Sequence, residues 1–215
     1  MDLVPEIRDF EPPDATVDLT PSQELVVRPN LFGRENEIGR ITEVLTAVEA
    51  EGHGRAIFLT GEAGAGKTAI ATAAIAAAQD RGFVTVQTPC EPFHAGISLY
   101  PIKELIRKLT GGASVTTFVN SAFGPTSYEA GIALNLESED ADSSLGREYT
   151  MATFANAVIG RSKLAAQPVL LFLDDLERID SASSDAILVL MSRIVDQPVV
   201  LLCASIRSQL SARTV

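Results

Sequence analysis

The residues best suited to chemistry lie in an eight-residue segment, GEAGAGKT, at positions 61–68. Gly61, Gly66, Lys67 and Thr68 fit the G-x-x-x-x-G-K-[ST] pattern of a phosphate-binding loop. Glycines at this spacing let successive backbone N–H groups surround phosphate oxygens, and the helix that follows directs its positive dipole end at the same anion. We expect the lysine to reach the β- and γ-phosphates and the threonine hydroxyl to ligate Mg²⁺.

The context of the segment favours this interpretation over a glycine-rich turn that matches by accident. An apolar run, RAIFLT, precedes the loop, and an alanine-rich stretch, AIATAAIAAA, follows it. A phosphate-binding loop needs a strand before it and a helix after it, and both patterns are present. We therefore expect the whole loop and the first helical residues to bind a nucleotide: Gly61, Glu62, Ala63, Gly64, Ala65, Gly66, Lys67, Thr68 and Ala69.

A second chemical segment, PVLLFLDD, lies about a hundred residues downstream. Residues 169–173 form a continuous apolar run, which is typical of a parallel strand buried on both faces. The run ends in Asp174 and Asp175. One carboxylate after such a strand can hold the Mg²⁺ shell, and its neighbour can orient or deprotonate an attacking water. We assign Asp174 to the metal and Asp175 to catalysis, with Glu177 as the weaker candidate for the catalytic carboxylate.

The elements that must position these residues form an α/β pattern. Strands are expected near 55–60, 83–88, 169–174 and 199–204. Helical crossovers between them would make the strands parallel in a three-layer sandwich. Helical spacing of Ile38, Ile41, Leu45 and Val48 predicts a helix after the LFGRE turn, and similar spacing predicts helices that begin near Pro101 and Gly146. Residues 112–146 are rich in glycine, serine, threonine and acidic residues, which predicts a polar surface loop.

Composition limits the classes of partner. The chain has 215 residues, 46% of them hydrophobic, and a formal net charge of −11. This charge argues against a nucleic acid held by a broad basic surface. The N-terminus is acidic and unlike a signal peptide, and no apolar run approaches the ~20 residues of a membrane span. We expect a soluble, cytoplasmic protein in which residues 1–30, with their prolines and acids, form an extended arm.

Three segments resemble the AAA-type P-loop ATPases of the STAND signalling class. LFGRE, at 31–35, resembles the box that opens their ATPase domain. LFLDDLERID resembles their second motif, an apolar strand followed by Asp-Asp-Leu and a later aspartate. The resemblance implies adenine contacts from Phe32, Gly33 and Arg34, and strands of the two motifs that lie side by side. SIR, at 205–207, resembles the end of their sensor strand, where Arg207 would read the γ-phosphate. Glu177 and Arg178 stand where the family has a glutamine or histidine followed by a tryptophan, so charges replace an aromatic residue there.

The resemblance covers about residues 31–210. Members of the class continue into a fifth strand and a small lid domain, whereas this sequence ends at Val215. We therefore expect residues 31–215 to be a partial ATPase domain. The strand before the phosphate loop would then lie at an edge of the sheet. A protein partner or missing C-terminal domains would complete the switch.

Three functions follow from these observations. The first is an ATP-binding and Mg²⁺-dependent ATP-hydrolysing domain of a signalling or regulatory protein, and the motif set favours it. The second is a DNA-linked ATPase of the origin-recognition type, which shares the GRE box and both acidic and phosphate motifs. The acidic composition weighs against it. The third is a module that holds nucleotide without turning it over.

Overall fold

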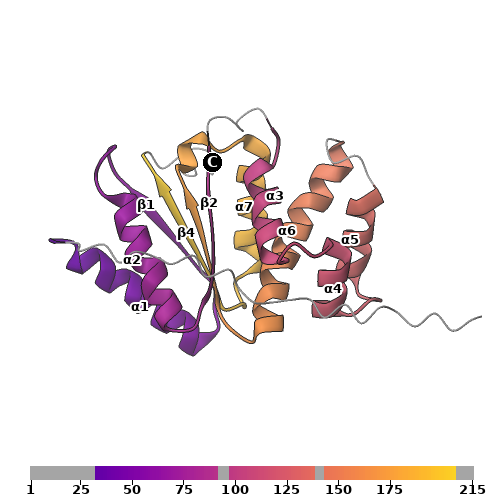
Figure 1. The fold of residues 1–215 in the computed structure, drawn as a ribbon, viewed down its shortest axis with the longest axis horizontal. Helices are drawn as coiled ribbons and strands as arrows, with labels where there is room; N and C mark the ends of the chain where they lie inside the picture. The colour runs from indigo at the N-terminus through magenta and orange to yellow at the C-terminus, as the bar shows by residue number, and fades with distance from the viewer. Residues whose placement is uncertain (1–31, 92–96, 139–142, 207–215) are drawn as a thin grey trace, which may run out of the picture.

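One parallel sheet organises the part of the chain that the computed structural model describes, residues 32–91, 97–138 and 143–206. The sheet has four strands in the order β1-β4-β3-β2 (Figure 1). Their bounds are β1 Arg55–Thr60, β2 Val84–Pro89, β3 Val169–Asp174 and β4 Val199–Ser205. Helices flank both faces, so the predicted α/β class with a parallel sheet is confirmed. The predicted arm, residues 1–30, lies outside the described residues.

The expected adjacency of β1 and β3 is wrong, because β4 lies between them. The burial of β4 and of β1 explains which of these two strands lies beside β3. All seven residues of β4 are buried, which suits a central strand. β1 begins at an exposed Arg55 and ends at an exposed Thr60, which suits an edge. The expectation that β1 lies at an edge agrees with the described sheet.

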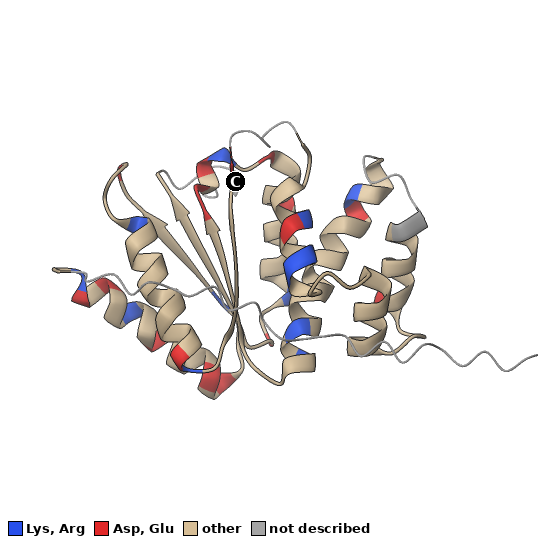
Figure 2. Ribbon diagram, viewed as in Figure 1, with Lys and Arg blue, Asp and Glu red and all other residues tan. Residues whose placement is uncertain are grey.

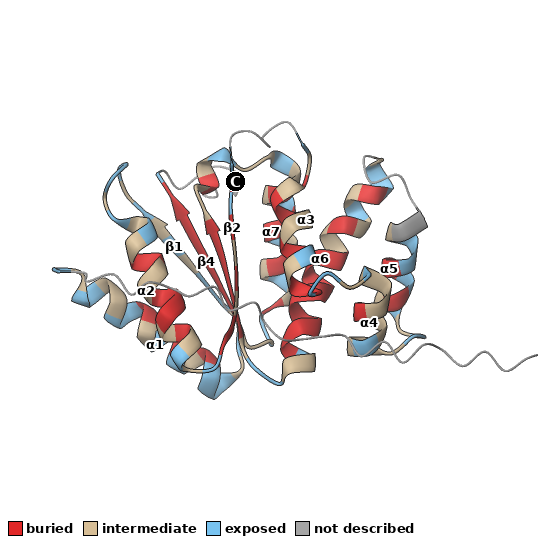
Figure 3. Cartoon of the chain, viewed as in Figure 1, coloured by how far each residue is buried: buried red, intermediate tan, exposed pale blue. Residues whose placement is uncertain are grey.

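Two hydrophobic cores lie on opposite faces of the sheet. Side chains of a strand alternate between the two faces, so each inner strand contributes to both cores. Helices α1 (Glu35–Glu51) and α2 (Lys67–Asp80) cover one face. They pack there against the strand residues Leu170, Phe172, Val200 and Leu202. Helices α3 (Tyr100–Leu109), α6 (Ser144–Ala165) and α7 (Ser181–Arg193) cover the other with Leu171, Leu173, Leu201 and Cys203 (Figure 3).

The polar loop predicted for residues 112–146 is wrong. The structure has two further helices there, α4 (Val115–Phe123) and α5 (Tyr128–Ser138), and α6 begins before the predicted loop ends. The serines that suggested a loop cap these helices. Ser114 Oγ accepts the Thr117 N–H at 3.1 Å, and Ser127 Oγ accepts the Ala130 N–H at 3.0 Å. Figure 1 shows α4 and α5 packed beside α6, away from the sheet.

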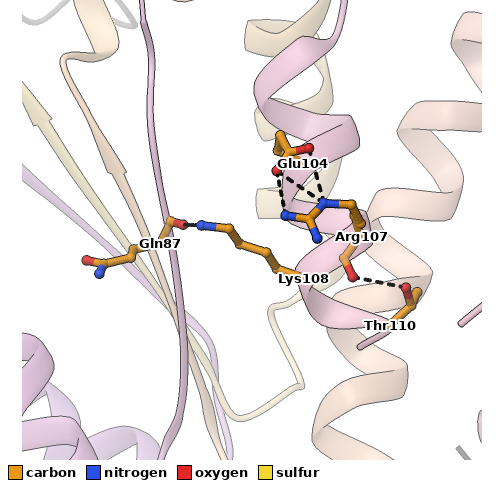
Figure 4. Close-up of polar contacts among 5 residues, drawn as sticks. All are labelled: Gln87, Glu104, Arg107, Lys108 and Thr110. Atoms are coloured by element: carbon orange, nitrogen blue, oxygen red, sulfur yellow. Dashed lines mark hydrogen bonds and ion pairs between the residues drawn. The ribbon is translucent and has the colours of Figure 1, made fainter. Parts of the chain in front are cut away.

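Helix α3 is fastened to the sheet edge formed by β2 (Figure 4). The N–H groups of Val84 and Cys90 donate to β3-side carbonyls, so the alternation of a parallel strand turns the carbonyl of Gln87 to the open edge. Lys108 Nζ of α3 donates to that carbonyl at 2.8 Å. The neighbouring Arg107 instead pairs with Glu104 along the helix at 3.0 Å. A lysine therefore satisfies a backbone acceptor that the sheet leaves open.

Acidic side chains gather on α1, at the outer side of the first helical layer (Figure 2). Four of its glutamates are exposed: Glu35, Glu43, Glu49 and Glu51. Two of these are paired with arginines, Glu49 with Arg81 at 2.7 Å and Glu51 with Arg55 at 2.8 Å. Within the described ranges, no helix is long and apolar enough to cross a membrane.

Candidate functional site

The glycine-rich segment joins β1 to α2 through a turn that only glycine adopts easily. Gly64 and Gly66 have φ values of 79° and 84°, in the left-handed region where a side chain would be strained. Helix α2 begins at Lys67, and no side chain caps its N-terminus. The first N–H groups of a 14-residue helix therefore face the loop without a side-chain acceptor. This is the geometry that binds an anion.

Lys67 folds back over the loop from the first position of α2. Its Nζ donates to the carbonyl of Gly61 at 3.1 Å and to the carbonyl of Glu62 at 2.9 Å. The ammonium group thus lies against the same loop whose backbone N–H groups are suited to phosphate. The arrangement of the loop and the lysine fits a bound phosphate chain, because the loop N–H groups and the Lys67 ammonium group are donors in one concave turn.

Thr68 and Asp174 meet although they lie 106 positions apart in the sequence. Thr68 Oγ1 donates to Asp174 Oδ2 at 2.9 Å. The two residues come from α2 and β3, so the loop and the first turn of α2 span the end of β4. A hydroxyl and a carboxylate are oxygen ligands of the kind that Mg²⁺ prefers. The described residues hold no cluster of three or more His, Cys, Asp or Glu, but Mg²⁺ commonly takes only one or two protein ligands.

Asp175 sits at the sharp turn that follows β3. Its φ of 53° and ψ of 45° place it in the left-handed region, which aspartate tolerates better than most residues. The Asp175 N–H donates to Asp174 Oδ1 at 2.9 Å. This bond and the bond from the Thr68 hydroxyl use both carboxylate oxygens of Asp174. Together they fix the orientation of Asp174, the predicted metal ligand. The Asp175 side chain remains partly exposed beside it.

Glu177, the weaker candidate for catalysis, has one oxygen bound to the end of β4, whereas its Oε1 is buried and has no hydrogen-bond partner among the described residues. It lies in η2, a short 3₁₀ turn (Leu176–Arg178), and its Oε2 accepts the Ile206 N–H at 3.1 Å. Burial alone would raise the pKa of Glu177, but hydrogen bonds from its own backbone, Ile206 and Ser205 outweigh it and lower the pKa. Arg207, the predicted γ-phosphate reader, lies outside the described residues, so its role stays a prediction.

The GRE box touches the phosphate loop through its arginine. One end of the Arg34 guanidinium pairs with Glu37 at 2.7 Å, and the other donates to the carbonyl of Ala65 at 2.9 Å. Phe32 is 90% exposed. Gly33 has a φ of 73°. The adenine contacts expected of these three residues stay a prediction, and the Arg34–Ala65 bond is a loop contact that sequence reasoning missed.

Two other polar groups near the strand ends have structural roles. Asp180 caps α7 by accepting the Ser183 N–H at 2.9 Å, and it also accepts the Leu99 N–H at 3.3 Å. Cys90 is buried, and this burial, with Asp175 and other nearby carboxylates, raises its pKa to about 12. A thiol held neutral in this way is a poor nucleophile.

A strand, a glycine loop and a helix N-terminus that meet a threonine–aspartate pair define the class of P-loop nucleoside triphosphatases. Residues 30–202 match the family model described as the AAA ATPase domain. The chain therefore belongs to the AAA ATPase domain family. No curated protein matches the chain at a significant level.

Two solved structures are similar to this chain over most of its length. One is the Aeropyrum pernix ORC1 protein in complex with DNA, with 18% identity and a TM-score of 0.46. The other is the HORMA:CdnC:Trip13 complex of E. coli MS115-1, with 15% identity and a TM-score of 0.42. The similarity covers 92% and 83% of this chain, but only 44% and 57% of theirs. The chain thus spans about half the length of these relatives.

Proposed function

We propose that the chain binds ATP with Mg²⁺ and hydrolyses it, as the nucleotide-dependent switch of a signalling or regulatory protein of the STAND type. The observation that carries the proposal is the 2.9 Å contact between Thr68 and Asp174 at the mouth of the phosphate loop. It joins the two motifs that metal-dependent phosphoryl transfer requires. The resemblance of the GRE and DDL segments to STAND proteins supports the signalling role.

Each candidate residue has a distinct task in this proposal. The N–H groups of the loop and the Lys67 ammonium group hold the β- and γ-phosphates. Thr68 and Asp174 hold Mg²⁺, which when bound neutralises the charge that develops on the phosphate oxygens. Asp175 orients or deprotonates the attacking water from its partly exposed position beside Asp174. Arg207 contacts the γ-phosphate.

The base of the nucleotide and the loop are connected by one side chain. In the proposal, Phe32, Gly33 and Arg34 border the adenine. Arg34 also donates to the carbonyl of Ala65 in the loop, at 2.9 Å. Adenine and phosphate contacts are therefore coupled through the guanidinium group, which gives the GRE segment a direct influence on the loop.

The decisive experiment measures ATP binding and ATP turnover side by side. The parent should gain thermal stability from Mg-ATP, by about 2.7 kcal/mol at a nucleotide concentration a hundredfold above Kd. Lys67→Ala should abolish this gain, because the loop loses its cation. A Lys67→Ala variant stabilised as strongly as the parent would contradict the assignment of the loop.

A second pair of variants separates catalysis from binding. Asp175→Asn should keep ATP-dependent stabilisation and reduce turnover at least a hundredfold, an effect of about 2.7 kcal/mol on the barrier. Glu43→Ala, on the exposed face of α1, is the matched control and should behave like the parent. If the parent binds ATP without measurable turnover, the binding-module function replaces hydrolysis.

A further inference from the structure

Strand β4 runs past the end of its neighbour β3. The β3–β4 ladder ends at the pair Leu173 and Cys203, whereas the β1–β4 ladder continues to the pair Thr60 and Ser205. Beyond Cys203, the β3 side of β4 therefore has no strand partner among the described residues. Ser205, which pairs with β1, is only 4% exposed, whereas the next residue, Ile206, is 40% exposed. The N–H of Ile206 is therefore open to an acceptor from a side chain instead of a strand.

Glu177 supplies the acceptor that β3 no longer provides. Its Oε2 accepts the Ile206 N–H at 3.1 Å, and the side chain of Ser205 also hydrogen-bonds to the carboxylate. Glu177 belongs to the turn that directly follows Asp174 and Asp175. One side chain thus joins the turn after β3 to the end of β4 across the site.

The end of β4 lies next to the entrance of the phosphate loop. Ser205 is paired with Thr60, and Thr60 is the residue before Gly61. The connection therefore runs from the acidic turn, through Glu177 and Ser205, to the start of the loop. A hydrogen bond to a charged acceptor is stronger than a neutral one, so this connection is a stiff one.

We propose that Glu177 is a positioning residue, not the catalytic base, and that it holds the end of β4 in register with the acidic turn and the phosphate loop. Its effect on turnover rests on the proposed ATPase function, whereas its effect on β4 does not. The distinction has a chemical consequence. A base needs a titratable carboxylate, but holding the Ile206 N–H needs only an acceptor oxygen, which glutamine also has.

The first measurement follows the Ile206 amide by hydrogen exchange, without nucleotide, in the full chain. Glu177→Ala should speed exchange at Ile206 about tenfold, the effect of losing one hydrogen bond to a charged group. Glu177→Gln should stay within about threefold of the parent, because its amide oxygen still accepts the bond. Glu43→Ala is the control. Equal exchange at Ile206 in the parent and in Glu177→Ala would overturn the proposal.

The second measurement compares ATP turnover in the same variants. Glu177→Ala should lower kcat about tenfold with little change in KM, and Glu177→Gln should restore most of the loss. Turnover in Glu177→Gln as low as in Glu177→Ala, with normal Ile206 exchange, would make Glu177 a base and overturn the proposal. A parent that neither binds nor hydrolyses ATP would defeat the proposed function, and the exchange result alone would then decide the role of Glu177.

Discussion

The two edge strands of the described sheet, β1 and β2, are covered to different extents. Along β2, buried and half-buried residues alternate until its last residue, and Lys108 of α3 occupies the open carbonyl of Gln87. Along β1, every residue is half-buried or exposed, and Phe58 is 39% exposed (Figure 3). The strand that carries the phosphate loop is therefore the less protected edge.

Besides its ladder with β4, β1 is held by hydrogen bonds at its two ends. At its start, the N–H of Gly54 donates to the carbonyls of Ile194 and Val195, both at 3.1 Å. At its end, the loop is tied by Lys67 and Arg34. Variants in and beside the two edge strands test whether β1 and β2 contribute differently to the free energy of unfolding.

The largest effect is expected from Gly54→Ala, at the anchor of β1. A Cβ at this position would collide with the main-chain oxygen of Ile194, which cannot move aside as a side chain can. We expect a loss of about 3 kcal/mol in the free energy of unfolding, measured by urea denaturation.

Gly131→Ala, in the middle of α5, is the matched control. A Cβ there meets nothing within 4 Å. Because alanine favours a helix more than glycine does, this variant should be stabilised by about 0.5–1 kcal/mol. If both variants lost stability equally, the special role of the β1 anchor would be refuted.

The next effect concerns the middle of each edge strand. Val86→Ala in β2 removes two methyl groups from a side chain only 8% exposed, and it should cost about 2 kcal/mol. Leu59→Ala in β1 removes more atoms, but from a half-buried position, and it should cost about 1 kcal/mol. Urea denaturation of both variants measures the difference, and a larger loss for Leu59→Ala would reverse the comparison.

The smallest effect concerns the lysine that covers the β2 edge. Lys108→Met keeps the apolar stem but leaves the carbonyl of Gln87 without this donor, so it should cost about 1 kcal/mol. Arg107→Gln disturbs only an exposed ion pair with Glu104 and should leave the midpoint of thermal unfolding unchanged. Equal midpoints for both variants would show that the bond to Gln87 contributes nothing.

Sequence reasoning succeeded where the interacting residues are close together in the chain. The helical spacing of Ile38, Ile41, Leu45 and Val48 predicts a helix, and three of these four residues are buried in α1. The apolar run at 169–173 forms β3. The GEAGAGKT segment forms the turn between β1 and α2. In each case, the pattern and the structure involve the same short stretch of chain.

It failed where composition or distant contacts decide. The glycine, serine, threonine and acidic residues of 112–146 predict a loop, but two of the serines, Ser114 and Ser127, cap helices. The order of the strands depends on which apolar runs have neighbouring strands on both edges. β3 and β4 are both apolar and buried, so no local pattern indicates which of them lies beside β1. The Glu177–Ile206 contact joins residues 29 apart, and no spacing rule indicates it.

The bonds from Lys67 to the carbonyls of Gly61 and Glu62 have a kinetic consequence. The ammonium group acts as an internal ligand of its own loop, so an incoming anion exchanges with two existing bonds instead of filling open space. For the proposed nucleotide, the free energy of releasing the lysine from these carbonyls would be subtracted from the binding free energy, and the release would be a step in association. The two Lys67 bonds therefore hold the loop in this shape without a ligand.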